Sequence, residues 1–85
     1  MNKKWSAISW NEYLYWQQTD KRIVKRINDL IKDIERNGAL KGKGEPEALK
    51  YRKGYSRRIN HEHRLVYLIE GNDLLIVSCK GHYED

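Results

Sequence analysis

The feature that most constrains the folding of this 85-residue chain is a stripe of apolar side chains between positions 23 and 34. The stripe consists of Ile23, Val24, Ile27, Leu30, Ile31 and Ile34. Separations of three and four residues place such side chains on one face of an α-helix. Asp20 is a favourable N-cap, and Gly38 can adopt the left-handed conformation that ends many helices. The pattern predicts a helix from about residue 21 to residue 36, which must bury its apolar face against another element.

A second helix is predicted before this one. Residues 4–8 form a candidate first strand, and Ser9 and Glu12 have the three-residue separation of a capping box, so we expect the helix to begin near Ser9. The face expected to pack consists of Trp10, Tyr13, Leu14 and Gln17. Because the two helices follow each other directly, we expect them to form one antiparallel layer.

The hydrophobic period shortens to two in the second half of the chain, after a basic loop expected over residues 40–47. Three candidate strands and a fourth, less regular one cover residues 55–60, 64–69, 74–80 and 49–52. Strands joined by short turns pair antiparallel. We therefore predict a single domain over residues 1–85 with an α+β fold, in which two N-terminal antiparallel helices pack on one face of a mainly antiparallel sheet of four to five strands.

Alternation within the strands predicts which side chains share a face. In the strand that begins at Arg64, one side holds Arg64, Val66 and Leu68 and the other holds Leu65, Tyr67 and Ile69. In the last strand, one side is expected to hold Leu74, Ile76, Ser78, Lys80 and His82, and the other side Leu75, Val77, Cys79 and Tyr83. We therefore expect His82 to project on the side of Lys80, and the spacing permits Arg64 and His82 to meet at the margin of the sheet.

The net charge of +5 is concentrated in the middle of the chain. Residues 41–64 carry eight Lys or Arg against three Asp or Glu, a net charge of +5 in this segment alone. Such a segment attracts polyanions, although a solvated basic face that keeps a small protein soluble has the same composition. The sequence has no apolar run of membrane-spanning length and no signal-peptide hydrophobic region, so we expect a cytoplasmic protein with no membrane contact.

Glu47 and His82 are the leading candidates for proton transfer. Glu47 follows the basic loop, and His82 follows the last predicted strand. By spacing alone, such a glutamate is more often a surface ion-pair partner and such a histidine a polar tail. Metal-free phosphodiester cleavage requires cations to hold the anion and titratable groups to move protons. The combination with the basic segment therefore favours an enzyme that cleaves RNA.

Metal and thiol chemistry are less favoured. His61 and His63 lie in a predicted turn, with no matching pair of ligands near them in sequence. The lone Cys79 has no cysteine for an intrachain disulfide, and its apolar strand predicts a small buried residue rather than a nucleophile. We therefore predict neither a metal nor a cofactor.

Short segments spread over the whole chain carry a specific resemblance. They are Trp5-Ser6, Ser9-Trp10, residues 13–17, residues 19–25, Gly42-Lys43-Gly44, Pro46-Glu47, Leu49-Lys50, residues 56–59, residues 62–67 and His82-Tyr83. Together they resemble the YoeB family of bacterial toxins, within the RelE-like superfamily. The resemblance implies a RelE-like microbial ribonuclease fold and a ribosome-dependent messenger-RNA endonuclease that a cognate antitoxin holds inactive.

The resemblance also implies a role for individual residues. Carried onto matching positions, it implies Glu47 as general base, His82 as general acid and Arg64 as the cation on the scissile phosphate. Supporting contacts to RNA are implied for Lys43, Lys50, Arg57, Arg58 and Tyr83. These groups suit the reaction, because the attacking ribose 2′-hydroxyl loses a proton, the phosphorane gains charge and the leaving 5′-oxygen needs a proton. The expected product is a 2′,3′-cyclic phosphate. Cleavage, unlike binding, is expected to be restricted to RNA, because DNA lacks the 2′-hydroxyl.

One alternative function is a basic module that binds ribosomal RNA and blocks translation without cutting. A relative that poisons DNA gyrase is disfavoured, because such relatives do not share Glu47, Arg64 and His82-Tyr83. The expected partners are the 70S ribosome with its messenger RNA and an acidic antitoxin. The aromatic-rich first helix is also compatible with a homodimer.

Overall fold

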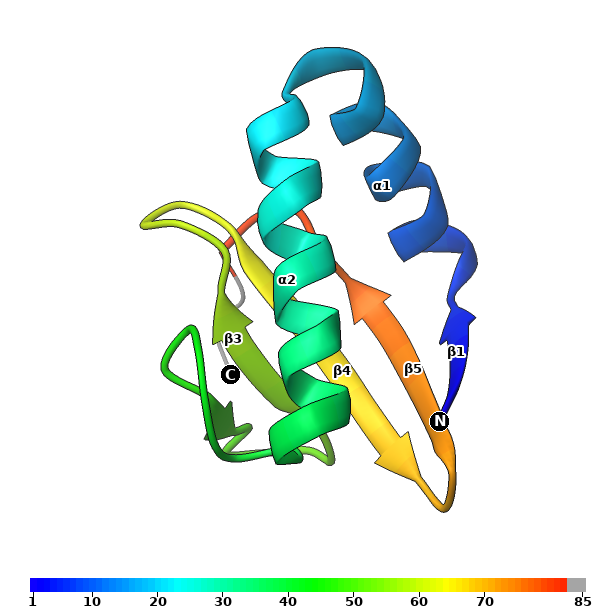
Figure 1. Ribbon diagram of the computed structural model, residues 1–85, viewed down its shortest axis with the longest axis vertical. Coiled ribbons are helices and arrows are strands. Elements are labelled where there is room, and N and C mark those ends of the chain that lie inside the picture. Colours follow the sequence, from blue (N-terminus) through cyan, green and yellow to red (C-terminus); the bar gives the residue numbers. More distant parts are fainter. Residues whose placement is uncertain (83–85) are drawn as a thin grey trace.

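The computed structural model describes residues 1–82 and contains two helices and a five-stranded sheet (Figure 1). In chain order, the elements are β1 (Asn2–Trp5), α1 (Ala7–Thr19), α2 (Lys21–Asn37), β2 (Glu47–Ala48), β3 (Tyr55–Arg58), β4 (Arg64–Glu70) and β5 (Asp73–Ser78). Neither of the helices in this part of the chain is long and apolar enough to cross a lipid bilayer.

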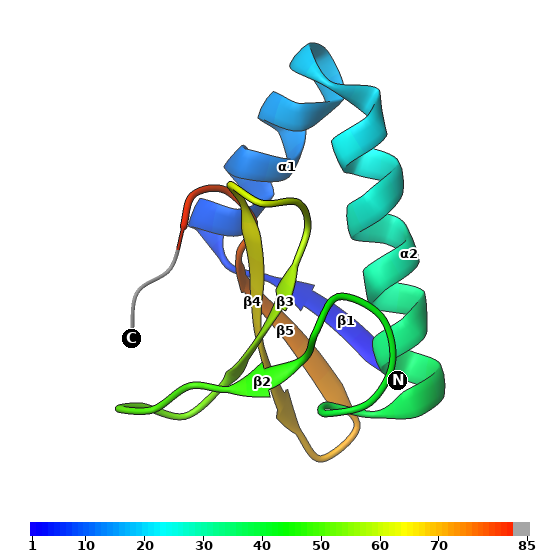
Figure 2. The ribbon, with the colours of Figure 1, turned by 90° about the vertical axis from the view of Figure 1, so that its left-hand side faces the viewer.

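The sheet has the strand order β1-β5-β4-β3-β2. β1 pairs parallel with β5, and the remaining neighbours pair antiparallel. The two helices run in opposite directions and cover the same face of the sheet (Figures 1 and 2). The predicted α+β fold, with its helices on one face of a mainly antiparallel sheet, is therefore confirmed.

The first helix begins earlier than the sequence predicted. Its N-cap is Ser6, whose Oγ accepts a hydrogen bond from the backbone amide of Ser9 at 3.0 Å. Ser9 therefore lies in the first turn, where it is buried and donates from Oγ to the carbonyl of Ile76 in β5 at 2.7 Å. The predicted capping box at Ser9 and Glu12 is wrong, because this contact with the sheet draws Ser9 into the interior.

The packed face of α1 also differs from the prediction. Trp16 is 6% exposed and faces the sheet, whereas Trp10 and Leu14 are 45% and 38% exposed. Ser9 and Trp16 are two turns apart on one side of the helix, and this side defines the contact with β5. The aromatic residues of α1 thus surround the helix instead of forming one apolar stripe.

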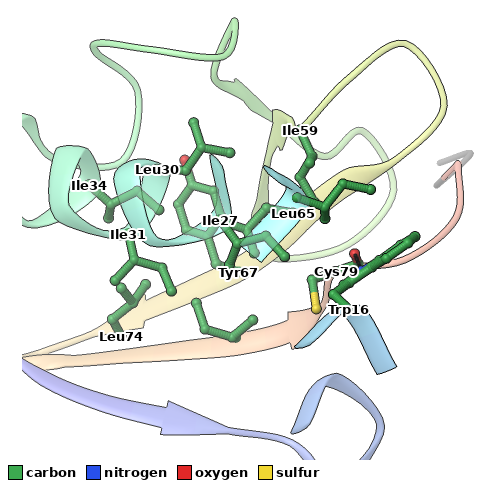
Figure 3. Close-up of a cluster of buried hydrophobic side chains, with 12 residues drawn as sticks. Trp16, Ile27, Leu30, Ile31, Ile34, Ile59, Leu65, Tyr67, Leu74 and Cys79 are labelled. Atoms are coloured by element: carbon green, nitrogen blue, oxygen red, sulfur yellow. Dashed lines mark hydrogen bonds between the residues drawn. The ribbon is translucent and has the colours of Figure 1, made fainter. Parts of the chain in front are cut away.

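The predicted second helix is confirmed. Asp20 is its N-cap, with Oδ1 accepting from the backbone amide of Arg22 at 3.0 Å, and Gly38 ends it with a φ of 89°. Its apolar stripe packs on the sheet and forms the core (Figure 3). The core side chains with 0% or 1% exposure include Ile27, Leu30, Ile34, Leu65, Tyr67, Leu74 and Ile76. Full burial of such an aliphatic side chain stabilises the fold by about 1.5–3 kcal/mol.

A β-bulge changes the predicted alternation in the last strand. Tyr67 lies opposite Ile76, but Val66 lies opposite Ser78, so Val77 is an extra residue in β5. Alternation in β4 follows the prediction, with Leu65 and Tyr67 in the helix-covered core. Beyond the bulge, the Cys79 side chain lies in the same core as Ile76, so the prediction that Cys79 and Ile76 project from opposite sides of the strand is wrong.

The candidate strand at residues 49–52 is also wrong. The amide of Leu49 donates to the carbonyl of Gly54 at 3.0 Å, and this bond closes a turn between β2 and β3. The edge strand is instead the short β2, which ends at Ala48.

Candidate active site

The sheet face away from the helices carries the candidate site. Directly opposite residues of paired strands project from the same face. Glu47 lies opposite Ser56, which lies opposite Val66. Two residues further along, Arg58 lies opposite Arg64. The register of β2, β3 and β4 therefore gathers a carboxylate, a hydroxyl and two guanidinium groups on one face.

Glu47 and Arg64 are in direct contact on this face. Arg64 Nη1 lies 3.3 Å from Glu47 Oε1 and donates to Ser56 Oγ at 3.1 Å. The Arg64 side chain is 14% exposed and that of Glu47 is 61% exposed. The guanidinium is therefore held in the sheet surface while the carboxylate is solvated. An ion pair with a solvated partner contributes only about 0–1 kcal/mol, so an incoming phosphate can replace the carboxylate on Arg64 at little cost.

The segment after β5 brings His82 to the same end of the sheet. The amide of Arg64 donates to the carbonyl of Gly81 at 3.0 Å, which continues the pairing with β4 beyond Ser78. Figure 2 shows this segment beside the start of β4. His82 is exposed and follows Gly81 directly, with their Cα atoms about 3.8 Å apart. Tyr83 lies outside the described residues.

Two side chains of α1 that the sequence did not assign to the site hold this segment. Glu12 Oε1 accepts from the amide of Cys79 at 2.7 Å, and Trp16 Nε1 donates to the carbonyl of Cys79 at 3.0 Å. The four-residue separation of Glu12 and Trp16 places both on one side of the helix. The sequence shows from this separation that the two side chains lie together, but it does not show which segment of the chain they would contact.

Cys79 is a buried residue of the core. It has 0% exposure, and its Sγ lies 3.6 Å from the carbonyl oxygen of Ser9. Burial, reinforced by the negative charge of Glu12, raises the pKa of the Cys79 thiol to about 12. The thiolate, which is the reactive form, is therefore scarce at neutral pH. The prediction of a small buried residue is confirmed.

Arg57 was expected among the RNA contacts, but its side chain has 0% exposure and is turned into the interior of the protein. The guanidinium donates from Nε to the hydroxyl of Tyr67, from Nη1 to Asp33 Oδ2 and the carbonyl of Lys43, and from Nη2 to the carbonyls of Gly38 and Lys41. Three of these five bonds end on carbonyl groups of the loop between α2 and β2. Arg57 organises the loop that leads to Glu47.

The Arg57 network includes a perturbed carboxyl group. A hydrogen bond from the backbone amide of Lys43, followed by the hydrogen bond and charge of Arg57, lowers the pKa of Asp33, although burial opposes this shift. Asp33 therefore remains ionised at neutral pH and fixes the same loop from the side of α2.

The remaining predicted RNA contacts are at the surface. Arg58 has a 46% exposed side chain whose Nε lies 3.7 Å from Glu45 Oε2. Lys43 and Lys50 are exposed on the segments that flank β2. Arg58 shares the sheet face of Arg64. These residues provide cationic surface around the contact between Glu47 and Arg64.

The arrangement offers a cation for a phosphate, a solvated carboxylate and an exposed imidazole at one end of the sheet. Such groups can bind a phosphodiester and move protons. Within residues 1–82, there is no group of three or more His, Cys, Asp or Glu side chains that could hold a metal ion.

Comparisons with known proteins converge on one family. The family described as "YoeB-like toxin of bacterial type II toxin-antitoxin system" matches residues 5–83. Toxin YoeB of Escherichia coli (strain K12) is 57% identical over 81 residues, covering 93% of this chain and 95% of that protein. A YoeB dimer from Staphylococcus aureus superposes with a TM-score of 0.93 at 54% identity, covering 98% of both chains. YoeB in a heterotetrameric complex with YefM, from the same organism, has a TM-score of 0.91 at 54% identity and the same coverage.

Proposed function

Because this chain belongs to the YoeB-like toxins of bacterial type II toxin-antitoxin systems, we propose that it inhibits translation by cleaving messenger RNA in the ribosomal A site. The observation that carries this proposal is the contact between Glu47 and Arg64, beside the segment that ends in His82. The reaction proposed is metal-independent endonucleolytic cleavage.

In the proposed reaction, Arg64 binds the scissile phosphate, and its position against Glu47 brings the carboxylate close to the adjacent ribose. Glu47 accepts the proton of the 2′-hydroxyl as the 2′-oxygen attacks phosphorus. Arg64 stabilises the charge of the phosphorane, and His82 donates a proton to the departing 5′-oxygen. The products are a 2′,3′-cyclic phosphate on one fragment and a 5′-hydroxyl on the other.

The ribosome supplies positioning in this proposal. Glu47 is 61% exposed, and a solvated ion pair does not by itself fix the geometry of a flexible RNA. Exposed cations at Lys43, Lys50 and Arg58 attract RNA without selecting a sequence. The purified chain is expected to cut ribosome-bound message much faster than the same RNA free in solution. Equal rates on the two substrates would contradict the proposed role of the ribosome.

Primer extension on a message translated in a reconstituted system tests the cleavage. The wild-type chain is expected to produce new ends inside the A site. Glu47→Gln and His82→Gln are expected to lower the first-order cleavage rate by about a hundredfold or more, since general acid-base groups contribute roughly 10²–10⁴-fold. Arg64→Ala removes the cation on the phosphate and is expected to cause a similar loss.

Matched surface variants control for these substitutions. Glu45→Gln changes an exposed glutamate two residues before Glu47, and His61→Gln changes an exposed histidine. Both are expected to cleave at rates within about twofold of wild type, since surface changes have small effects. A module that only blocks the ribosome would instead inhibit translation without new ends and would retain its potency after Glu47→Gln and His82→Gln.

We further propose a cognate antitoxin as a partner. The related YoeB from Staphylococcus aureus forms a heterotetrameric complex with YefM. The net charge of +5 in residues 41–64 favours an acidic antitoxin segment over the basic face of this chain. Addition of that antitoxin is expected to stop cleavage stoichiometrically, and its affinity is expected to fall as salt is raised. Inhibition that did not change with ionic strength would contradict this electrostatic contribution.

We also propose that the chain forms a homodimer, as a YoeB from Staphylococcus aureus does. Helix α1 exposes Ile8, Trp10, Leu14 and Tyr15, by 66%, 45%, 38% and 47%. Large exposed apolar side chains gathered on one element are typical of interfaces. Light scattering is expected to give the mass of two chains for wild type and a lower mass for Trp10→Ser at the same concentration. A wild-type mass equal to one chain would contradict the dimer.

A further inference from the structure

His63 is fixed in a rigid turn between β3 and β4. The side chain of Asn60 accepts hydrogen bonds from the amides of Glu62 and His63 at 2.8 and 2.7 Å, and the amide of Ile59 donates to the carbonyl of His63 at 2.9 Å. Asparagine side chains that bind the amides of following residues stabilise such turns. The His63 side chain is only 13% exposed, so both its backbone and its ring are held in place.

The His63 ring contacts the segment that carries His82. Its Nδ1 accepts a hydrogen bond from the amide of Gly81 at 2.8 Å. The ring packs edge-on against Trp16, with centroids 4.8 Å apart, and Nε2 lies 3.6 Å from Glu62 Oε2. A backbone amide can only donate, so Nδ1 carries no proton and the neutral ring holds its proton on Nε2.

The backbone of residues 79–81 is held at both ends by groups from other parts of the chain. Glu12 binds the amide of Cys79, Trp16 binds its carbonyl, His63 binds the amide of Gly81, and the Arg64 amide binds the Gly81 carbonyl. Gly81 has a φ of 95°, in the left-handed region, so the chain changes direction at this residue. His63 is therefore the side chain that fixes the peptide between Lys80 and Gly81, while the Arg64 amide holds the carbonyl of the following peptide, which joins Gly81 to His82.

We infer that His63 is a positioning residue, which aims His82 by accepting the hydrogen bond of the Gly81 amide. This inference rests on the cleavage reaction proposed for the site. Without that acceptor, the peptide between Lys80 and Gly81 can rotate, and His82 moves relative to the phosphate on Arg64. A misplacement of about 1 Å can cost on the order of a hundredfold in rate. His63 itself does not contact the reacting atoms.

Two substitutions separate the acceptor from the packing of the ring. His63→Phe keeps an aromatic ring against Trp16 and removes the acceptor, whereas His63→Asn keeps an amide oxygen near the position of Nδ1 and removes the ring. His61→Phe changes an exposed histidine of the same turn and serves as the control. Thermal melts of all four chains establish that each is folded.

The decisive measurement is single-turnover cleavage of ribosome-bound message at increasing toxin concentration. His63→Phe is expected to lower the saturating rate about tenfold or more while the half-saturating concentration stays within about twofold. His63→Asn and His61→Phe are expected to retain most of the rate. The inference is overturned if His63→Phe cleaves at the wild-type saturating rate, or if His63→Asn loses as much as His63→Phe.

Hydrogen exchange of the Gly81 amide, followed by NMR on the chain alone, gives a readout that does not depend on activity. The amide is expected to exchange slowly in wild type and fast in His63→Phe. Equal exchange in the two chains would refute the tether. If wild type does not cleave message while its Gly81 amide is protected, the proposed function fails although the tether stands.

Discussion

Replacement of Arg57 by methionine is expected to destabilise the fold strongly, because the Arg57 side chain is buried, whereas that of the adjacent Arg58 is exposed. The methionine side chain would keep much of the volume and remove every hydrogen-bond donor of the guanidinium. Removal of one partner of a buried ion pair costs about 3–5 kcal/mol. Asp33 keeps its bonds from Lys43 and Asn37, and Tyr67 still donates to Ala39. These remaining bonds place the expected loss near the lower limit, at about 3 kcal/mol.

Arg58→Met is the matched control, because Arg58 is the next residue of β3 and faces solvent. Its side chain is 46% exposed, and its partner Glu45 is 74% exposed. The median contribution of such a surface pair is about 0–1 kcal/mol. The comparison therefore separates the burial of a guanidinium from the charge and size of an arginine.

Urea unfolding followed by tryptophan fluorescence measures the difference. For a small domain, a slope of about 1–3 kcal/mol per M converts a loss of 3 kcal/mol into a fall of about 1–3 M in the midpoint. The melting temperature is expected to fall by roughly 12–24 °C. Asp33→Asn keeps an acceptor without the charge and is expected to lose less than Arg57→Met. If Arg57→Met and Arg58→Met lower the midpoint equally, the buried network does not stabilise the fold as argued.

Three other predictions test the interior and its charges. Gly44→Ala is expected to destabilise the fold more than Gly38→Ala. Both glycines have a positive φ, but a Cβ at position 44 would lie 3.0 Å from Leu30 Cδ2, whereas a Cβ at position 38 would meet no atom within 4 Å. Equal urea midpoints for the two variants would contradict this. The thiol of Cys79, with 0% exposure and a pKa raised to about 12, is expected to react with a thiol reagent only in the unfolded chain, and fast labelling without denaturant would contradict its burial. Folding lowers the pKa of Asp33, so the stability that its carboxylate contributes is present above the usual pKa of 3.8 and is lost as pH falls through the folded pKa. The urea midpoints of wild type and Asp33→Asn are therefore expected to converge in acid. A difference between the midpoints that stays constant with pH would contradict this.

Local sequence signals predicted α2 and its buried face correctly. The spacing of its apolar residues, the N-cap Asp20 and the terminating Gly38 all act within a few residues of one another. The start of α1 could not be predicted in the same way, because Ser6 and Ser9 are equally suitable caps by residue type. The bond from Ser9 Oγ to Ile76 in β5 decides between them.

The two adjacent arginines of β3 show the same limit for the site. Arg57 and Arg58 point to opposite faces of the sheet, and residue type does not reveal which face meets the loop after α2. The resemblance placed both among the RNA contacts, but the structure buries one and exposes the other. The bulge at Val77, which turns Cys79 into the core, is likewise absent from any local pattern.

The sequence by itself determined α2, the approximate positions of β3, β4 and β5, the surplus of positive charge and the residue types able to handle a phosphate, because these depend on near neighbours and composition. Only the tertiary structure decided that Glu47 meets Arg64, that α1 and His63 fasten the segment before His82, and that Arg57 is structural. Such contacts join residues far apart in the chain, and strand register and packing fix them together as the core closes.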